Sequence, residues 1–135
     1  MTRWFYEKLS SFKHSNGKPI FQIYGDHVKN DRKKQGGIVT FNILDTNGKY
    51  VGYSQVMKPS ANNNFMVRAG CSCNPGACHS YMGLNEEIIE YAAQERQNCA
   101  DEKDKINGLP LGAVRVSFGY PTTLEEVDKY ADFLY

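Results

Sequence analysis

Residues 36–53 read GGIVTFNILDTNGKYVGY, and this stretch decides the fold. The apolar run from Ile38 to Leu44 is rich in β-branched and aromatic residues, which predicts a strand. The Asn47-Gly48 dipeptide that follows is the strongest short hairpin signal, because both residues readily adopt the positive φ angles of a tight turn. We therefore expect a β-hairpin whose return strand runs from Tyr50 to Tyr53.

Outward from this hairpin, strand and helix signals are mixed along the chain. Further strands are predicted at residues 19–24, 65–68 and 112–120, and helices at residues 2–13, 78–96 and from residue 123 onward. The last helix has the clearest start, since Thr123 and Glu126 form a T-x-x-E capping box. Residues 54–64 are ambiguous, because Ser54 could cap a short helix whereas Pro59 disfavours a helix interior. The order of elements predicts one α+β domain, residues 1–135, with a short, mostly antiparallel sheet covered by helices.

Length and composition limit the classes of protein to which the chain can belong. Its 135 residues suffice for one domain with a core and are too few for two. The hydrophobic share of 41% excludes a disordered chain, and no apolar run approaches the roughly 20 residues that a membrane helix needs. Sixteen basic and fifteen acidic residues leave a net charge of +1, so neither a membrane nor a nucleic acid is an expected partner.

The first residues, MTRWFYEKL, show no long apolar run and no small-residue cleavage pattern, so we expect no secretion signal. Without such a signal, the four cysteines are predicted to be thiols or metal ligands in a reducing compartment. We therefore expect a cytoplasmic protein.

The polar stretch from His27 to Gln35 carries several basic side chains. These are Lys29, Arg32, Lys33 and Lys34. A solvated loop is the favoured interpretation, since a dedicated anion site would need supporting geometry. His14 and His27 stand in polar surroundings and are predicted to be surface residues.

The densest chemistry lies in residues 68–79, which read RAGCSCNPGACH. The cysteines in it are Cys71, Cys73 and Cys78. A metal site would combine them with His79 or Cys99, but the C-x-C and C-x₄-C spacings depart from the paired C-x₂₋₄-C knuckles of structural zinc. Buried inert thiols are a second interpretation, although a loop with Gly, Asn and Pro is poor core material. The favoured interpretation is a reactive thiolate, because Arg68 and the start of the next helix would lower a cysteine pKa.

Arg115 lies in an alternating strand, GAVRVSFGY, at residues 112–120. An arginine in such a strand most often points to solvent, and composition alone favours that interpretation. A guanidinium held by a rigid strand is also suited to clamp a carboxylate through two parallel hydrogen bonds. The residues alone leave both alternatives open.

Together these motifs resemble the molybdenum cofactor sulfurases. The similarity is carried by R-x-G-C-x-C-N-x-G-A-C at residues 68–78, N-G-x-P-x-G-A-V-R-V-S-F-G-Y at residues 107–120 and T-x-x-E at residues 123–126. Residues 37–45 and 52–56 add to it, so the resemblance spans essentially the whole chain. It is to the C-terminal part of the family's cysteine-desulfurase-like domain, which is of the class V aminotransferase superfamily.

The resemblance implies the fold-type-I architecture of pyridoxal-phosphate enzymes. There, a large domain holds the cofactor on a lysine and a smaller α+β domain closes over it, and this chain would be the smaller, C-terminal one. The large domain and the domain that binds the molybdenum cofactor would lie outside the chain, so neither cofactor-binding residues nor metal ligands are expected here. The isolated chain is therefore not expected to be active, and the full-length enzyme is expected to be a homodimer.

The resemblance also implies a sulfur relay. L-cysteine would be desulfurated to alanine with pyridoxal phosphate as electron sink, and its sulfur held as a persulfide on an enzyme cysteine. The sulfur would then pass to the molybdenum cofactor of xanthine-dehydrogenase-type and aldehyde-oxidase-type enzymes. The family's motif implies that Cys73 is the catalytic, persulfide-bearing cysteine, and that Arg115 and Arg68 are substrate-binding residues. Cys71 and Cys78 would be relay or supporting positions.

One alternative belongs to a different functional class. The same cysteines would suit a small cysteine-rich metal-binding interaction module, and stoichiometric zinc in the pure chain would favour that alternative.

Overall fold

The computed structural model describes residues 1–71, 74–96 and 103–135, to which all structural statements below refer. The α-helices are α1 (Thr2–Ser11), α2 (Tyr53–Asn62), α3 (Pro75–Met82), α4 (Glu86–Glu95) and α5 (Leu124–Leu134). The strands are β1 (Phe21–Tyr24), β2 (Ile38–Ile43), β3 (Arg68–Gly70), β4 (Lys105–Ile106), β5 (Leu109–Pro110) and β6 (Ala113–Ser117), and a 3-10 turn, η1, covers His27–Lys29. None of the described helices has the length and apolar character to span a membrane.

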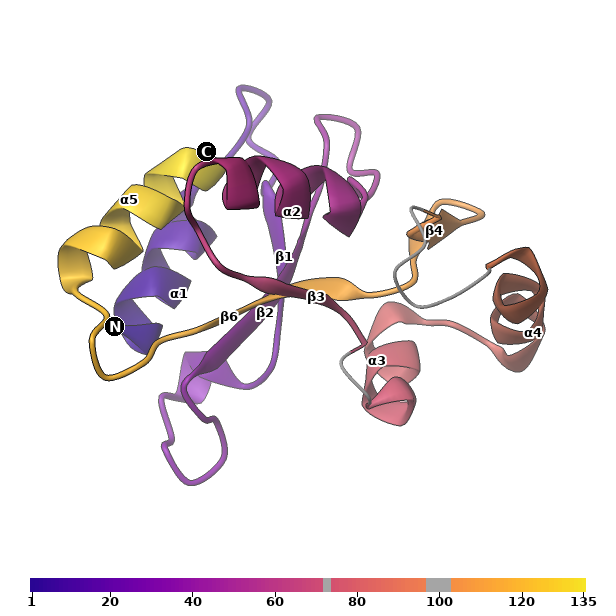
Figure 1. The fold of residues 1–135 in the computed structure, drawn as a ribbon, viewed down its shortest axis with the longest axis horizontal. Helices are drawn as coiled ribbons and strands as arrows, with labels where there is room; N and C mark the ends of the chain where they lie inside the picture. Colours follow the sequence, from indigo (N-terminus) through magenta and orange to yellow (C-terminus); the bar gives the residue numbers. More distant parts are fainter. Residues whose placement is uncertain (72–73, 97–102) are drawn as a thin grey trace.

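Four strands form one antiparallel sheet in the order β1-β2-β6-β3. The last strand in the sequence, β6, therefore lies between β2 and β3, which precede it in the chain. Helices α1 and α5 lie side by side at one end of the molecule, with α2 next to them, whereas α3, α4 and the small β4–β5 pair gather at the other end (Figure 1). The predicted α+β domain with a mostly antiparallel sheet covered by helices is therefore confirmed.

One face of this sheet forms the main core. Val114 and Val116 of β6 and Phe41 of β2 are buried on it, packed with side chains of the three helices α1, α2 and α5. Each fully buried large apolar side chain of this kind contributes about 1.5–3 kcal/mol. Because strand side chains alternate between faces, Thr40 and Arg115, which neighbour these residues, project from the opposite face. The strand pattern therefore sets Thr40 and Arg115 apart from the main core.

Helices α1 and α5 are joined by a polar cluster in addition to their apolar contact. The ammonium of Lys8 lies 2.8 Å from carboxylate oxygens of both Asp128 and Asp132. The indole N–H of Trp4 donates to Asp128 over 2.9 Å. Residues near the two ends of the sequence are thus held together.

The predicted hairpin forms its turn but not its return strand. The Gly48 N–H donates to the Asp45 carbonyl over 2.9 Å, and Tyr50 pairs with Leu44 only as an isolated bridge. The chain instead enters α2. The start of this helix is capped by Asp104, a residue distant from it in the sequence. The backbone N–H and the hydroxyl of Ser54 donate to the buried carboxylate of Asp104 over 2.8 Å and 2.5 Å. The prediction of a strand at residues 50–53 is wrong because this tertiary contact decides the local structure.

The predicted single helix at residues 78–96 is two helices. Gly83, with a φ of +67°, ends α3 in the left-handed conformation that glycine favours. The Asn85 side chain then accepts the Ile88 N–H over 2.9 Å and starts α4. Residues 105–110, for which no strand was predicted, form the β4–β5 pair around Asn107-Gly108. The stop and start residues were present in the sequence but were outweighed by the apolar periodicity.

Candidate functional site

The pairing of β3 with β6 brings two distant motifs together. In the antiparallel register Arg68 lies opposite Arg115, and Gly70 lies opposite Ala113. A Cβ atom at Gly112 would stand 2.5 Å from the Cα of Gly70, so the close approach of the two backbones requires a glycine there. Cys71, the residue after β3, therefore lies beside the strand that carries Arg115.

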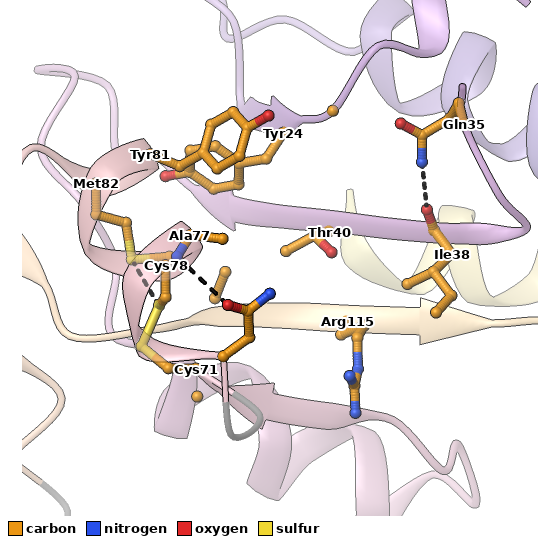
Figure 2. Close-up of a pocket in the computed structure, with 14 residues that line it drawn as sticks. Tyr24, Gln35, Ile38, Thr40, Cys71, Ala77, Cys78, Tyr81, Met82 and Arg115 are labelled. Carbon is orange, nitrogen blue, oxygen red and sulfur yellow. Dashed lines mark hydrogen bonds between the residues drawn. A yellow bond between two sulfur atoms is a disulfide. The ribbon is translucent and has the colours of Figure 1, made fainter. Parts of the chain in front are cut away.

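These two segments open into a cavity of about 260 Å³ (Figure 2). Its lining includes Arg115 from β6, Thr40 from β2 and Tyr24 from β1, together with Tyr81 and Met82 from α3. In Figure 2, the cysteine pair and Tyr81 lie at one end of the cavity and Arg115 toward the other. The cavity thus has an apolar, aromatic part and a cationic part, which is the usual character of a small-molecule site.

Arg115 is the cationic group of this cavity. It is half-buried, and its cross-strand neighbours are Thr40 on β2 and Arg68 on β3, so all three side chains share one face of the sheet. No ion pair among the described residues involves Arg115 or Arg68. Two like charges in adjacent strands repel each other, and an anionic ligand would relieve that repulsion. Arg115 therefore lines the cavity with its side chain partly covered and without a described ion-pair partner.

Cys71 and Cys78 form a disulfide whose Cα atoms are 5.4 Å apart. The expectation that the cysteines are thiols is therefore wrong for this pair. Their sulfur atoms also contact the Leu111 carbonyl oxygen at 3.4 Å and the Met82 sulfur at 3.6 Å. Neither cysteine can carry a persulfide or bind a metal while the disulfide is intact, and the metal-binding module would need both as ligands.

Two cysteines singled out from the sequence, Cys73 and Cys99, lie outside the described residues. Within the described part of the chain, no three His, Cys, Asp or Glu side chains come together as a metal site. The residues that adjoin the Cys73 segment, Cys71 and Asn74, both line the cavity. The structure thus brings Arg115, Cys71 and Cys78 to one site, with Arg68 as the cross-strand neighbour of Arg115.

Helix α3 begins at the edge of this cavity. The Asn74 side-chain oxygen accepts the Ala77 N–H over 3.4 Å, and Pro75 occupies the first helical position. Proline is favoured there because its missing N–H would have no helical partner. Residues 74–76 of the motif, N-P-G, therefore form the start of α3, the helix on which Cys78 lies.

Tyr24, Thr40 and Tyr81 also line the cavity, although the sequence did not mark them as candidate site residues. The rings of Tyr24 and Tyr81 meet edge to face with centroids 6.1 Å apart. The Tyr24 hydroxyl is buried, and burial is the main cause that raises its pKa, so the phenol stays neutral. Strand alternation does place Thr40 on the face opposite Phe41, but no local signal identifies the two tyrosines.

Comparison with known proteins agrees with the resemblance of the motifs. The molybdenum cofactor sulfurase of Bos taurus is 41% identical and that of Homo sapiens 40% identical over 134 residues, which is 99% of this chain and 15% of each relative. The Drosophila melanogaster protein of the same name is 39% identical over 136 residues, which is 99% of this chain and 17% of that relative. No family model matches the chain, and no solved structure matches it. Across 99% of its residues, this chain is therefore homologous to one segment of the molybdenum cofactor sulfurases.

Proposed function

We propose that this chain is the part of a molybdenum cofactor sulfurase that binds the carboxylate of L-cysteine and carries the thiol that takes up its sulfur. The observation that supports this most is the β3–β6 register, which sets Arg68 opposite Arg115 beside one cavity. The names of the relatives supply the overall role, transfer of sulfur to the molybdenum cofactor.

Arg115 would hold the substrate carboxylate. Its planar guanidinium can donate two parallel hydrogen bonds to the two carboxylate oxygens. A strand between two others is a rigid support, and β6 has β2 on one side and β3 on the other. Arg68, on the same face, would add positive potential. The substrate would therefore be oriented by its carboxylate, with its sulfur free to meet a thiolate.

Cys73 would be that thiolate. Its sulfur bonds to the sulfur of L-cysteine while the Cβ–S bond breaks, and the electron pair of that bond remains on carbon, which takes up a proton. The products are alanine and a Cys73 persulfide. Because the Cys71–Cys78 disulfide occupies the two other nearby sulfurs, it would support the loop and leave Cys73 as the reactive thiol.

The cofactor would come from outside this chain. No lysine is among the residues that line the cavity, so the described residues do not fit a Schiff-base site for pyridoxal phosphate. That group, held elsewhere in the full-length protein, would supply the electron sink for carbon–sulfur cleavage. In this proposal residues 1–135 are the smaller domain of a homodimeric cytoplasmic enzyme, and the domain that accepts the sulfur lies in the rest of the protein.

Mass spectrometry of the cysteine-treated full-length protein tests the proposal. We expect the added sulfur on a proteolytic peptide that contains Cys73, and its loss in Cys73→Ser. The matched control is Cys71→Ser/Cys78→Ser, which removes the disulfide and should keep measurable desulfuration. A first persulfide on Cys78, with Cys73→Ser still active, would contradict the assignment.

A further inference from the structure

A second cavity, of about 390 Å³, lies between the start of α1 and the polar stretch that follows β1. It shares Gln35 with the Arg115 cavity and is otherwise lined by different residues. The same stretch was interpreted from the sequence as a solvated loop, for want of supporting geometry. The structure supplies that geometry.

His27 lines this cavity and is buried, so its predicted place on the surface is wrong. Only 5% of the residue is exposed, and its ring stacks on Tyr6 with centroids 5.2 Å apart. Burial lowers the pKa of the imidazole. Its Nε2 atom has no hydrogen-bond partner among the described residues. Buried polar atoms are rarely left unpaired, so this nitrogen indicates a missing partner.

Two arginines line the same cavity. The Arg3 Nε donates to Glu7 over 2.6 Å and its Nη1 donates to the His27 carbonyl over 3.1 Å, which leaves Nη2 without a described partner. Arg32 forms no ion pair with any described residue. One carboxylate, Asp31, also lines the cavity, and its Oδ1 accepts the Lys33 N–H over 3.0 Å. Arg3 is thus paired with Glu7 and keeps its Nη2 for a further acceptor, whereas Arg32 has no described carboxylate partner.

We propose that this cavity binds a phosphate group, with Arg3 and Arg32 holding the phosphate oxygens and His27 Nε2 as a further partner. Arg3 from α1 and Arg32 and His27 from the stretch after β1 offer three groups to a tetrahedral anion, whereas a planar carboxylate is satisfied by one guanidinium fork. The Nε2 atom of a neutral imidazole can accept a hydrogen bond that the P–OH group of a phosphate monoanion donates. The cavity volume falls in the range of about 300–1,000 Å³ that small-molecule sites have, so a phosphate monoester fits the space as well as free phosphate does.

Isothermal titration of the full-length protein with inorganic phosphate, and separately with AMP, tests this site. We expect saturable binding that weakens about tenfold in Arg32→Gln, the loss expected for one charge-assisted contact. His27→Asn should weaken it as well. The matched control is Lys33→Gln, which removes the same charge from the same loop at a residue that does not line the cavity and should change the affinity less than about twofold. Because Arg32 and Lys33 are both exposed, neither variant threatens the fold.

Comparison of the two probes identifies the source of the phosphate. Tighter binding of AMP than of inorganic phosphate, lost in Arg32→Gln, assigns the site to a phosphate monoester, and the reverse order assigns it to free phosphate. Equal weakening by Lys33→Gln and Arg32→Gln would overturn the proposal, since it would show a diffuse positive potential. The absence of any binding sensitive to Arg32 or His27 would overturn it too.

Discussion

Asp104 is a buried carboxylate that acts on a helix far from it in the sequence. It accepts the Ser54 N–H at the start of α2, where backbone donors have no helical partner. A Cβ atom at Gly52 would collide with the same carboxylate, so glycine at this position leaves room for Asp104 at the helix start. One side chain therefore fixes the place at which the strand pattern ends and α2 begins.

Replacement of Asp104 should destabilise the protein. Asp104→Ala removes the acceptor of a partly buried N–H and hydroxyl, so the free energy of unfolding should fall by about 1–3 kcal/mol. Asp104→Asn retains one acceptor oxygen and should lose less. Gly52→Ala should also destabilise, whereas Gly76→Ala, which meets no atom within 4 Å, is the matched control. Urea midpoints measure these differences, and an unchanged midpoint in Asp104→Ala would show that the cap carries no stability.

The guanidinium of Arg115 should matter to substrate binding. If Arg115 binds the substrate carboxylate as proposed, Arg115→Ala in the full-length protein removes a bidentate contact worth roughly 1.5–3 kcal/mol, and kcat/KM for cysteine should fall about ten- to a hundredfold. Arg115→Lys should restore only part of it, because an ammonium lacks the planar fork. Lys13→Ala removes one exposed charge elsewhere and serves as control. Unchanged desulfuration kinetics in Arg115→Ala would place the clamp elsewhere.

At the scale of elements, local signals predicted α5, β2 and β6 well. The box that starts α5 is present, with Thr123 Oγ1 accepting the Glu126 N–H and Glu126 accepting the Thr123 N–H. The elements that were missed depend on contacts between distant residues, as at α2, or on a glycine stop, as at Gly83. The same division holds at the site. The motifs identified Arg115 and the cysteines. The Cys71–Cys78 disulfide and the position of Tyr24 in the cavity lining depend on tertiary packing that no motif encodes.

The capping box gives a prediction for the stability of α5. Thr123→Ala should lower the free energy of unfolding by about 1 kcal/mol, since Thr123 accepts a helix N–H that has no other partner. The bond from the Thr123 N–H, the largest cause, lowers the pKa of Glu126 below its ordinary value of 4.5. The stability that the ionised Glu126 carboxylate contributes is therefore fully present above pH 4.5, the ordinary pKa. This stability is lost as the pH falls through the lowered pKa of the folded protein.

Thermal unfolding from pH 7 to pH 3 measures this effect. The stability difference between the unsubstituted protein and Glu126→Gln should narrow at the acidic end of the range. Thr46→Ala, an exposed threonine in a turn, is the control for Thr123→Ala. A difference between Glu126→Gln and the unsubstituted protein that does not vary with pH would contradict the role assigned to the carboxylate.

At the scale of the whole molecule, the apolar side chains form two separate clusters. The larger one joins the sheet to α1, α2 and α5 and includes fully buried Phe5, Leu9 and Phe41. The smaller one joins α3, α4 and the β4–β5 pair and includes Met82 and Ala92. Helix α4 buries only Ala92 among its residues. The end of the molecule that holds the cysteine pair is therefore the less strongly packed one.

Hydrogen exchange should resolve this difference. Amides of β2 and β6 should exchange only through global unfolding, whereas amides of α4 should open at a lower free energy, because few apolar contacts oppose local opening there. Hydrogen exchange of the full-length protein, followed by mass spectrometry of peptides from residues 38–43 and 86–95, measures the protection of β2 and of α4. Equal protection of the two peptides would show that the clusters unfold as one unit.

The place of β6 in the sheet also sets an order of events during synthesis. A ribosome releases the chain from its N-terminus, so β1, β2 and the three clustered cysteines emerge before β6 does. Until then β3 has no neighbouring strand, because β6 is its partner in the sheet. A translation product that stops short of Ala113 therefore contains every cysteine of the cluster and lacks Arg115. The fold thus delays the assembly of the cavity that Arg115 and the cysteine pair line until β6 has been made.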